Sequence, residues 1–136
     1  MKTNELMIGD IVRVSKDVCF KKGTIVKIHG IDADNAFIEK GLKGSATCMQ
    51  VNDQDRFTGG VWCDFLEPIP LTPEILEKNL ATEHQISWCI GWDRKDDIHV
   101  EIKRENLHAA FYGVIDFVHE LQHALRLCGI EKEIEL

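Results

Sequence analysis

The residues of this chain with the clearest chemical potential lie near the end of the sequence. His119, Glu120 and His123 spell H-E-x-x-H within the segment VHELQHALRLCG, which covers residues 118–129. On a helix, the two histidines of this motif lie one turn apart and can bind Zn²⁺, while the glutamate acts as general base on a zinc-bound water. The motif makes a zinc-dependent hydrolase the first hypothesis to test.

A zinc site of this kind needs a third protein ligand, and the sequence does not supply one at the expected places. The extended metzincin pattern places a glycine and then a histidine where this chain has Arg126 and Gly129. The thermolysin-like pattern takes a glutamate from a later helix, and only seven residues follow Gly129. A third ligand would have to come from a partner chain or from the glutamates Glu131, Glu133 and Glu135.

The position of the motif on its helix favours a packing role over a metal site. At about 100° per residue, the apolar residues of the segment form one stripe, which consists of Val118, Leu121, Leu125 and Cys128. His119 and His123 fall outside this stripe, so we expect both histidines to point away from the core. The favoured interpretation therefore assigns no catalytic, cofactor-binding or metal-binding residue.

Three further groups of side chains could carry chemistry. Glu101 and His108 could form a general acid/base pair, and Trp88 with Trp92 could stack on a ligand. A basic group near Phe20 could bind phosphate, and it consists of Arg13, Lys16, Lys21, Lys22 and Lys27. The favoured interpretations are structural: a solvated cross-strand pair, core aromatic residues and a solvated loop.

The charge distribution weighs against a role in nucleic-acid binding. The chain of 136 residues has a net charge of −7. Residues 1–70 carry nine Lys/Arg against ten Asp/Glu, and residues 71–136 carry seven against thirteen. Affinity for nucleic acids comes mainly from neutralising phosphates with lysine and arginine. Only the basic part of the first half could bind a nucleic acid, and another protein is the expected partner.

The cysteines and the first residues predict a reduced, cytoplasmic protein. The five cysteines are scattered and never spaced C-x-x-C, and they are Cys19, Cys48, Cys63, Cys89 and Cys128. This pattern argues against a disulfide framework and a zinc ribbon, and it indicates reduced thiols that mostly fill the core. The opening MKTNELMIGD lacks the apolar region of a signal peptide, and no apolar run is long enough to span a bilayer.

The first half of the chain predicts a small β-barrel. Short apolar stretches separated by turn residues indicate five strands, which fall within MIGDIVRV, KKGTIVKIHGI, NAFIEKGL, ATCMQV and GGVWCDFLEPIPL. The Gly-Asp turn before the first strand and the closing LEPIPL resemble SH3-like barrels. We therefore expect an SH3-like β-barrel over residues 1–70.

The second half, residues 71–136, predicts an α+β subdomain. Thr72 is a good N-cap and Pro73 suits the first helical position, which predicts a short helix over residues 73–80. A final helix over about residues 116–128 is expected to be capped by Asp116 and ended by Gly129. The predicted fold is α+β, with an N-terminal SH3-like β-barrel followed by a small antiparallel sheet packed on one C-terminal helix.

The strands of this sheet are predicted from their alternation of apolar and polar residues. Residues 86–92 and 98–102 alternate, and residues 107–115 fit a strand better than the start of a long helix. The register that places Ile98 opposite Phe111 also places Glu101 beside His108. That register puts the two polar side chains, together with His99, on the face away from the core.

Three motifs give the chain a resemblance to a known group of proteins. They are the opening ELMIGDIV, the sequence EPIPLT within residues 66–76, and a V-H-x-L-Q core within residues 117–136. Together they resemble a family of small proteins from bacterial prophages and mobile elements. The resemblance implies no known activity or cofactor. It also implies that the zinc motif is not a family feature, because that family commonly has Gln in the place of Glu120 and often lacks the second histidine.

We therefore expect the chain to be a non-catalytic binding or accessory protein of a mobile element, and we expect it to bind another protein. The first alternative is a zinc-dependent hydrolase with His119 and His123 as ligands and Glu120 as base. The second alternative is nucleic-acid binding through the lysines of the first half, which are Lys16, Lys21, Lys22 and Lys27.

Overall fold

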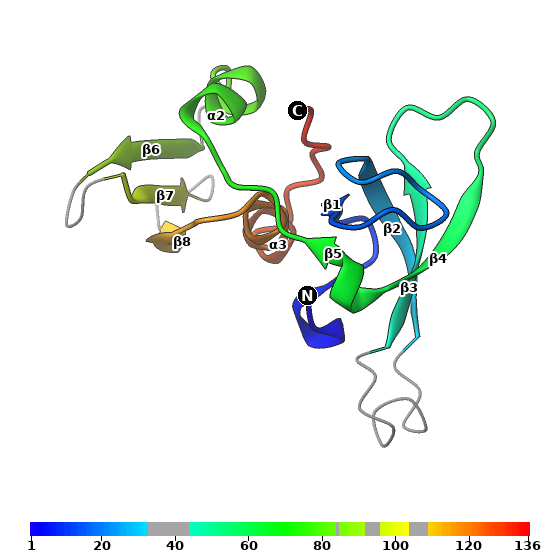
Figure 1. Ribbon diagram of the computed structural model, residues 1–136. Coiled ribbons are helices and arrows are strands. Elements are labelled where there is room, and N and C mark those ends of the chain that lie inside the picture. The colour runs from blue at the N-terminus through cyan, green and yellow to red at the C-terminus, as the bar shows by residue number, and fades with distance from the viewer. Residues whose placement is uncertain (33–43, 84, 92–95, 104–108) are drawn as a thin grey trace. The chain divides into compact units, whose positions relative to one another are not determined.

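The computed structural model describes residues 1–32, 44–83, 85–91, 96–103 and 109–136 (Figure 1). The described residues contain two antiparallel sheets, of five and three strands, and two α-helices. The predicted α+β class is confirmed. The chain divides into two compact units, Met1–Ile69 and Pro70–Leu136. None of the helices in the described part is both long enough and apolar enough to cross a membrane.

The first unit is built on the five-stranded sheet, whose order is β4-β3-β2-β1-β5. Its strands are β1 (Ile11–Val14), β2 (Ile25–Asp32), β3 (Ser45–Gln50), β4 (Thr58–Trp62) and β5 (Leu66–Glu67). Two short 3₁₀ helices accompany them, η1 (Thr3–Glu5) and η2 (Cys63–Phe65). The predicted SH3-like barrel is not confirmed, because β4 and β5 lie at opposite edges of a sheet that the described strands leave open. The strand predicted in NAFIEKGL lies outside the described residues.

The apolar alternation of these strands builds one core. Alternate residues of β1 to β4 are buried, and these residues are Val12, Val14, Val26, Ile28, Ala46, Cys48 and Val61. The Gly-Asp turn in front of β1 has a clear physical basis. Gly9 has a positive φ of 93°, and its N–H donates to the Ile28 carbonyl at 2.7 Å. The buried Asp10 carboxylate accepts the Met7 N–H at 2.8 Å, which closes the turn.

The second unit contains the three-stranded sheet and both α-helices. Its elements are α2 (Pro73–Leu80), β6 (Ile86–Ile90), β7 (Ile98–Lys103), β8 (Ala109–Val114) and α3 (Val118–Leu127). Figure 1 shows the three strands side by side, with β7 between β6 and β8. The predicted α2 is confirmed, and the Thr72 hydroxyl accepts the Ile75 N–H at 3.3 Å. The strand predicted for residues 107–115 is confirmed over Ala109–Val114.

The predicted pairing of β7 with β8 is wrong. Phe111 lies opposite Ile102 rather than Ile98, and Glu101 lies opposite Tyr112, with an irregularity between Ile102 and Lys103. A shift by four residues keeps Phe111 and Tyr112 on their predicted faces, because strand side chains alternate with a period of two. The apolar pattern therefore identified the faces correctly but did not select the register.

Both ends of α3 use local hydrogen bonds. Phe117 is the N-cap residue, so the predicted capping by Asp116 is wrong. The Asp116 N–H instead donates to the Glu120 carboxylate at 3.1 Å. At the other end, the Ile130 N–H donates to the Leu125 carbonyl at 2.9 Å, and Gly129 has a φ of 74°. This is a Schellman motif, and it confirms Gly129 as the residue that ends the helix.

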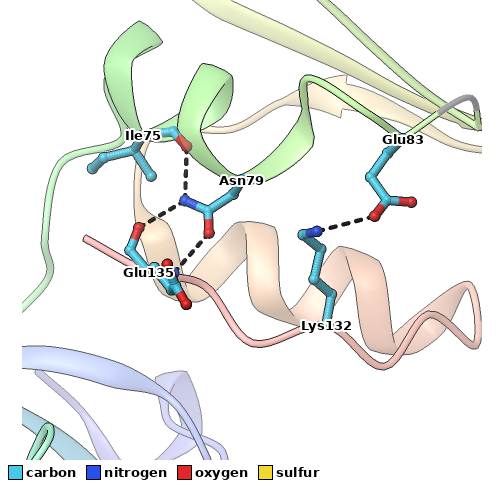
Figure 2. Close-up of polar contacts among 5 residues, drawn as sticks. All are labelled: Ile75, Asn79, Glu83, Lys132 and Glu135. Atoms are coloured by element: carbon cyan, nitrogen blue, oxygen red, sulfur yellow. Dashed lines mark hydrogen bonds and ion pairs between the residues drawn. The ribbon is translucent and has the colours of Figure 1, made fainter.

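The last residues of the chain are held by the side chain of Asn79. Figure 2 shows its amide, on α2, facing the backbone of Glu135. The amide oxygen accepts the Glu135 N–H at 2.7 Å, and the amide nitrogen donates to the carbonyls of Glu135 and Ile75 at 2.7 and 2.8 Å. Lys132 forms an ion pair with Glu83 at 3.0 Å (Figure 2). Asn79 thus pairs with the tail as a neighbouring strand would.

Candidate functional site

The H-E-x-x-H residues lie on α3, but their surroundings differ from those predicted. Val118, Leu121 and Leu125 are buried as expected. His119 is also buried, with 6% of its surface exposed, so the prediction that both histidines point away from the core is wrong for His119. Two rings cover it: Phe117 stacks on it with centroids 5.9 Å apart, and His123 meets it edge-on at 5.5 Å. The buried face of α3 is therefore wider than the apolar stripe.

Glu120 has a structural role that its place in the motif does not reveal. Its carboxylate accepts the Asp116 N–H, which lies just before the N-cap residue, and so stabilises the start of α3. Glu131, Glu133 and Glu135 of the tail are exposed. Among the residues that the structure describes, no three His, Cys, Asp or Glu side chains gather in a group that could hold a metal ion. The described part of the chain brings no third ligand to the motif.

The predicted basic group of the first unit is partly engaged in contacts within that unit. Arg13 forms an ion pair with Glu67 at 2.6 Å. The ammonium nitrogen of Lys16 lies 4.8 Å from the centroid of the Phe65 ring, a cation–π contact. Lys21 and Lys22 are exposed in the loop between β1 and β2. The group is thus spread over a loop and two strands.

The cross-strand position that the predicted acid/base pair assigned to His108 is occupied by Tyr112. Glu101 lies opposite Tyr112 and approaches Lys103, with 3.8 Å between the ammonium nitrogen and a carboxylate oxygen. His108 and Trp92 lie outside the described residues. Trp88 is half-buried opposite Val100, on the apolar face of the sheet.

The three-stranded sheet has one apolar face and one mixed face, which we call the open face. The apolar face contains the buried residues Ile86, Ile98, Val100 and Ile102. The open face consists of Ser87, Cys89, His99, Glu101, Lys103, Tyr112 and Val114, by the alternation of the strands. Tyr112 and Val114 are 62% and 44% exposed on the edge strand β8, and Cys89 is exposed on β6. The open face therefore presents apolar and polar groups together.

His99 lies at the centre of the open face and has unusual surroundings. It is on the middle strand, directly between Cys89 on β6 and Val114 on β8. The Tyr112 ring lies beside it, with centroids 6.2 Å apart. Only 5% of His99 is exposed, yet neither ring nitrogen has a hydrogen-bond partner among the described residues. Such an unpaired buried group costs about 1–3 kcal/mol, and native proteins rarely keep one without a reason.

The importance of His99 was missed by reasoning from the sequence. Its position on the far face follows from alternation, but alternation also predicts that such a residue is solvated. The available signal was a polar residue in the middle strand, flanked by Ile98 and Val100. Its burial is a property of the folded chain that alternation along one strand does not predict.

Comparison with protein-family models, with curated proteins and with solved structures finds no match, so the predicted family resemblance stays a prediction and any function must be inferred from the geometry of the chain itself.

Proposed function

We propose that the protein is a non-catalytic binding module, an accessory protein of a mobile element, which engages another protein through the open face and the β8 edge of its C-terminal sheet. The observation that supports this proposal is His99, whose buried ring nitrogens lack hydrogen-bond partners in the described part of the chain. Tyr112 lies beside it on an edge strand and is largely exposed. A bound partner that packs against the Tyr112 ring can supply the missing hydrogen bond.

The edge strand β8 supports the same proposal. Its sequence AAFYGV has no charge and no proline. Exposed sheet edges usually carry charged residues or proline, because these residues prevent uncontrolled pairing with other chains. The Phe111 ring lies over Gly113, where an added Cβ would come within 3.2 Å of it. An extended segment of a partner can pair with β8 through backbone hydrogen bonds and place alternate side chains over Tyr112 and Val114.

The charge of the second half indicates the kind of partner. Residues 71–136 carry thirteen acidic side chains against seven basic ones. Complementary charge speeds association and disfavours wrong partners. The proposed partner is therefore a protein segment that binds in extended conformation and carries a net positive charge.

Selection from a random peptide library displayed on phage tests this proposal. We expect extended, basic peptides whose affinity falls about tenfold or more in Tyr112→Ala and in His99→Leu, as for residues at the centre of an interface. Leu127→Ala is the matched control, because Leu127 is 80% exposed but lies on α3. The control should bind within about twofold of wild type. Peptides that bind wild type and Tyr112→Ala equally would contradict the proposal.

The zinc-dependent hydrolase with His119, Glu120 and His123 remains the alternative that the motif suggests. Its direct test is metal analysis of protein purified without a histidine tag. Stoichiometric zinc that disappears in His123→Ala would favour the hydrolase over the binding module.

A further inference from the structure

Two cysteines that are distant in the sequence lie near the same cross-strand position in the first unit, at Gly59. Gly59 on β4 is the direct cross-strand partner of Cys48 on β3. A Cβ added to Gly59 would come within 2.6 Å of the Cys19 sulfur, which belongs to the loop between β1 and β2. The Cys19 thiol thus fills the place where a side chain of residue 59 would be, next to the side chain of Cys48. This close approach also explains the glycine at position 59.

The Cys19 sulfur occupies the side-chain place of residue 59, directly across the strands from Cys48, and from this arrangement a bond between the two sulfurs can form. Directly opposite residues of antiparallel strands have Cβ atoms about 4.5–5.5 Å apart, and a disulfide needs Cβ atoms about 3.8 Å apart. The Cys19 thiol lies 3.7 Å from the Gly60 carbonyl oxygen, and the Cys48 thiol 3.7 Å from the Ala46 carbonyl oxygen. Both contacts are weak thiol hydrogen bonds, so rotation of the side chains costs little.

The two thiols differ in their access to solvent. Cys19 is exposed, whereas Cys48 is completely buried. Burial, with smaller contributions from the neighbouring Cys19 and Cys63, raises the pKa of the Cys48 thiol from 9.0 to about 12. Cys48 therefore keeps its proton at neutral pH and is shielded from reagents in solution. An oxidant reaches Cys19 first.

We propose that Cys19 and Cys48 form a two-cysteine redox site, in which a hydroperoxide oxidises Cys19 and Cys48 then closes an intramolecular disulfide. In the first step the Cys19 sulfur attacks the peroxide, the O–O bond breaks, and a sulfenic acid and one water or alcohol form. In the second step the Cys48 sulfur attacks the sulfenic sulfur. The hydroxyl leaves with the Cys48 proton as water, so two thiols are oxidised by two electrons and one peroxide is reduced.

The disulfide would tie the loop between β1 and β2 to the strand β3. That loop also carries the exposed Lys21 and Lys22, next to Phe20, whose ring lies 5.6 Å from the Phe57 ring. Oxidation would therefore restrain the loop that carries these lysines. The surface that the loop presents would then depend on the redox state of the two thiols.

Peptide mapping after oxidation tests this site directly. Trypsin, which cleaves after lysine and arginine, places each cysteine on a separate peptide: residues 17–21, 44–56, 57–78, 79–94 and 127–132. Reduced protein at low concentration is treated with hydrogen peroxide, blocked with N-ethylmaleimide, digested and analysed by mass spectrometry. We expect peptides 17–21 and 44–56 to be linked, with a total mass lower by two hydrogen atoms.

Matched variants distinguish this site from general oxidation. Cys63→Ala removes the other buried cysteine of the unit and should keep the link between Cys19 and Cys48. Cys48→Ala should lose the link and leave Cys19 as a sulfenic acid that dimedone traps. Cys19→Ser should also lose the link, and it does so by a substitution at an exposed position where folding is not at risk. A link from Cys19 to Cys63, or over-oxidation of Cys19 in wild type without any link, would overturn the proposal.

Discussion

His99 and Cys48 are both buried, and each carries a group that water solvates well in the unfolded chain. The imidazole of His99 lacks hydrogen-bond partners in the described part of the protein, and the Cys48 thiol is held in its neutral form. In both cases the folded state pays for the burial of a polar or ionisable group. The two residues therefore give predictions in which the sign of the effect on stability is informative.

Replacement of His99 by leucine should stabilise the protein. An apolar side chain removes the two unpaired nitrogens and keeps most of the volume, so we expect the free energy of unfolding to rise by about 1–2 kcal/mol. Urea denaturation followed by tryptophan fluorescence measures it, and Ser87→Ala on the same face is the control, expected within about 0.5 kcal/mol of wild type. A clear loss of stability in His99→Leu would show that the imidazole makes a stabilising contact.

Cys48 should make the protein less stable at alkaline pH. The unfolded thiol ionises near its ordinary pKa of 9.0, whereas the folded thiol keeps its proton up to about pH 12. Between these values the folded state binds more protons, so the free energy of unfolding falls as pH rises, by up to about 1.4 kcal/mol per pH unit. The slope of stability against pH should be smaller in Cys48→Ala and unchanged in Cys128→Ala. Equal slopes in all three proteins would exclude this effect.

At the scale of elements, α3 and the tail are fixed by contacts of different kinds. The helix is held by buried side chains on a wide face and by hydrogen bonds at its two ends. The tail has no helix or strand of its own and depends on Asn79 and on the Lys132–Glu83 ion pair. Substitutions in the buried face of α3 should therefore affect global stability, whereas substitution of Asn79 on α2 should release the tail.

Substitutions along α3 separate a packing helix from a metal site. Leu121→Ala and Leu125→Ala should cost about 2–5 kcal/mol through cavities in the core. His119→Ala should cost about 1–3 kcal/mol, because the buried ring packs against Phe117, and His123→Ala about 0.5 kcal/mol. Thermal melting with and without a chelator measures these effects. If the helix only packs, the chelator leaves every melting temperature unchanged; a chelator-sensitive wild type would support the zinc alternative.

Asn79→Ala should detach the tail. The substitution removes three hydrogen bonds and leaves the Glu135 N–H and carbonyl without their partner, at a cost of about 1–3 kcal/mol. Hydrogen exchange of residues 130–136 should become much faster. Lys78→Ala is the matched control on α2: it removes only the exposed contact with the Leu136 carbonyl and should leave exchange at Glu135 slow. Unchanged protection in Asn79→Ala would show that other contacts hold the tail.

At the scale of the whole molecule, charge decides which partners can bind. The net charge of −7 is concentrated in the second half, and Arg13 and Lys16 of the first half are engaged with Glu67 and Phe65. Only Lys21 and Lys22 of the predicted basic group are exposed side by side. Neutralisation of so few phosphates gives weak affinity that salt abolishes.

Titration with short DNA duplexes should therefore show weak binding at low salt, and this binding should be lost as the salt concentration is raised to about 0.2 M. Fluorescence anisotropy measures the affinity at several salt concentrations, with the double variant Lys21→Glu, Lys22→Glu as the control. Tight binding that persists at physiological salt and is lost in the double variant would support the nucleic-acid alternative.

The sequence by itself determined those features that depend on neighbouring residues. Thr72 and Pro73 predicted the start of α2, Gly129 predicted the end of α3, and alternation predicted the faces of β7. Each signal acts within one helical turn or one strand, where a cap, a positive φ or a period of two is sufficient.

The tertiary structure decided the features that depend on which surfaces meet. The burial of His119, the register between β7 and β8, the open five-stranded sheet and the approach of Cys19 to Gly59 all lie in this class. A shift of four residues leaves the apolar pattern of β8 unchanged, and nothing near Cys19 in the sequence indicates that Gly59 leaves room for its sulfur. Contacts between distant segments are selected by the packing of the whole core, which no local pattern contains.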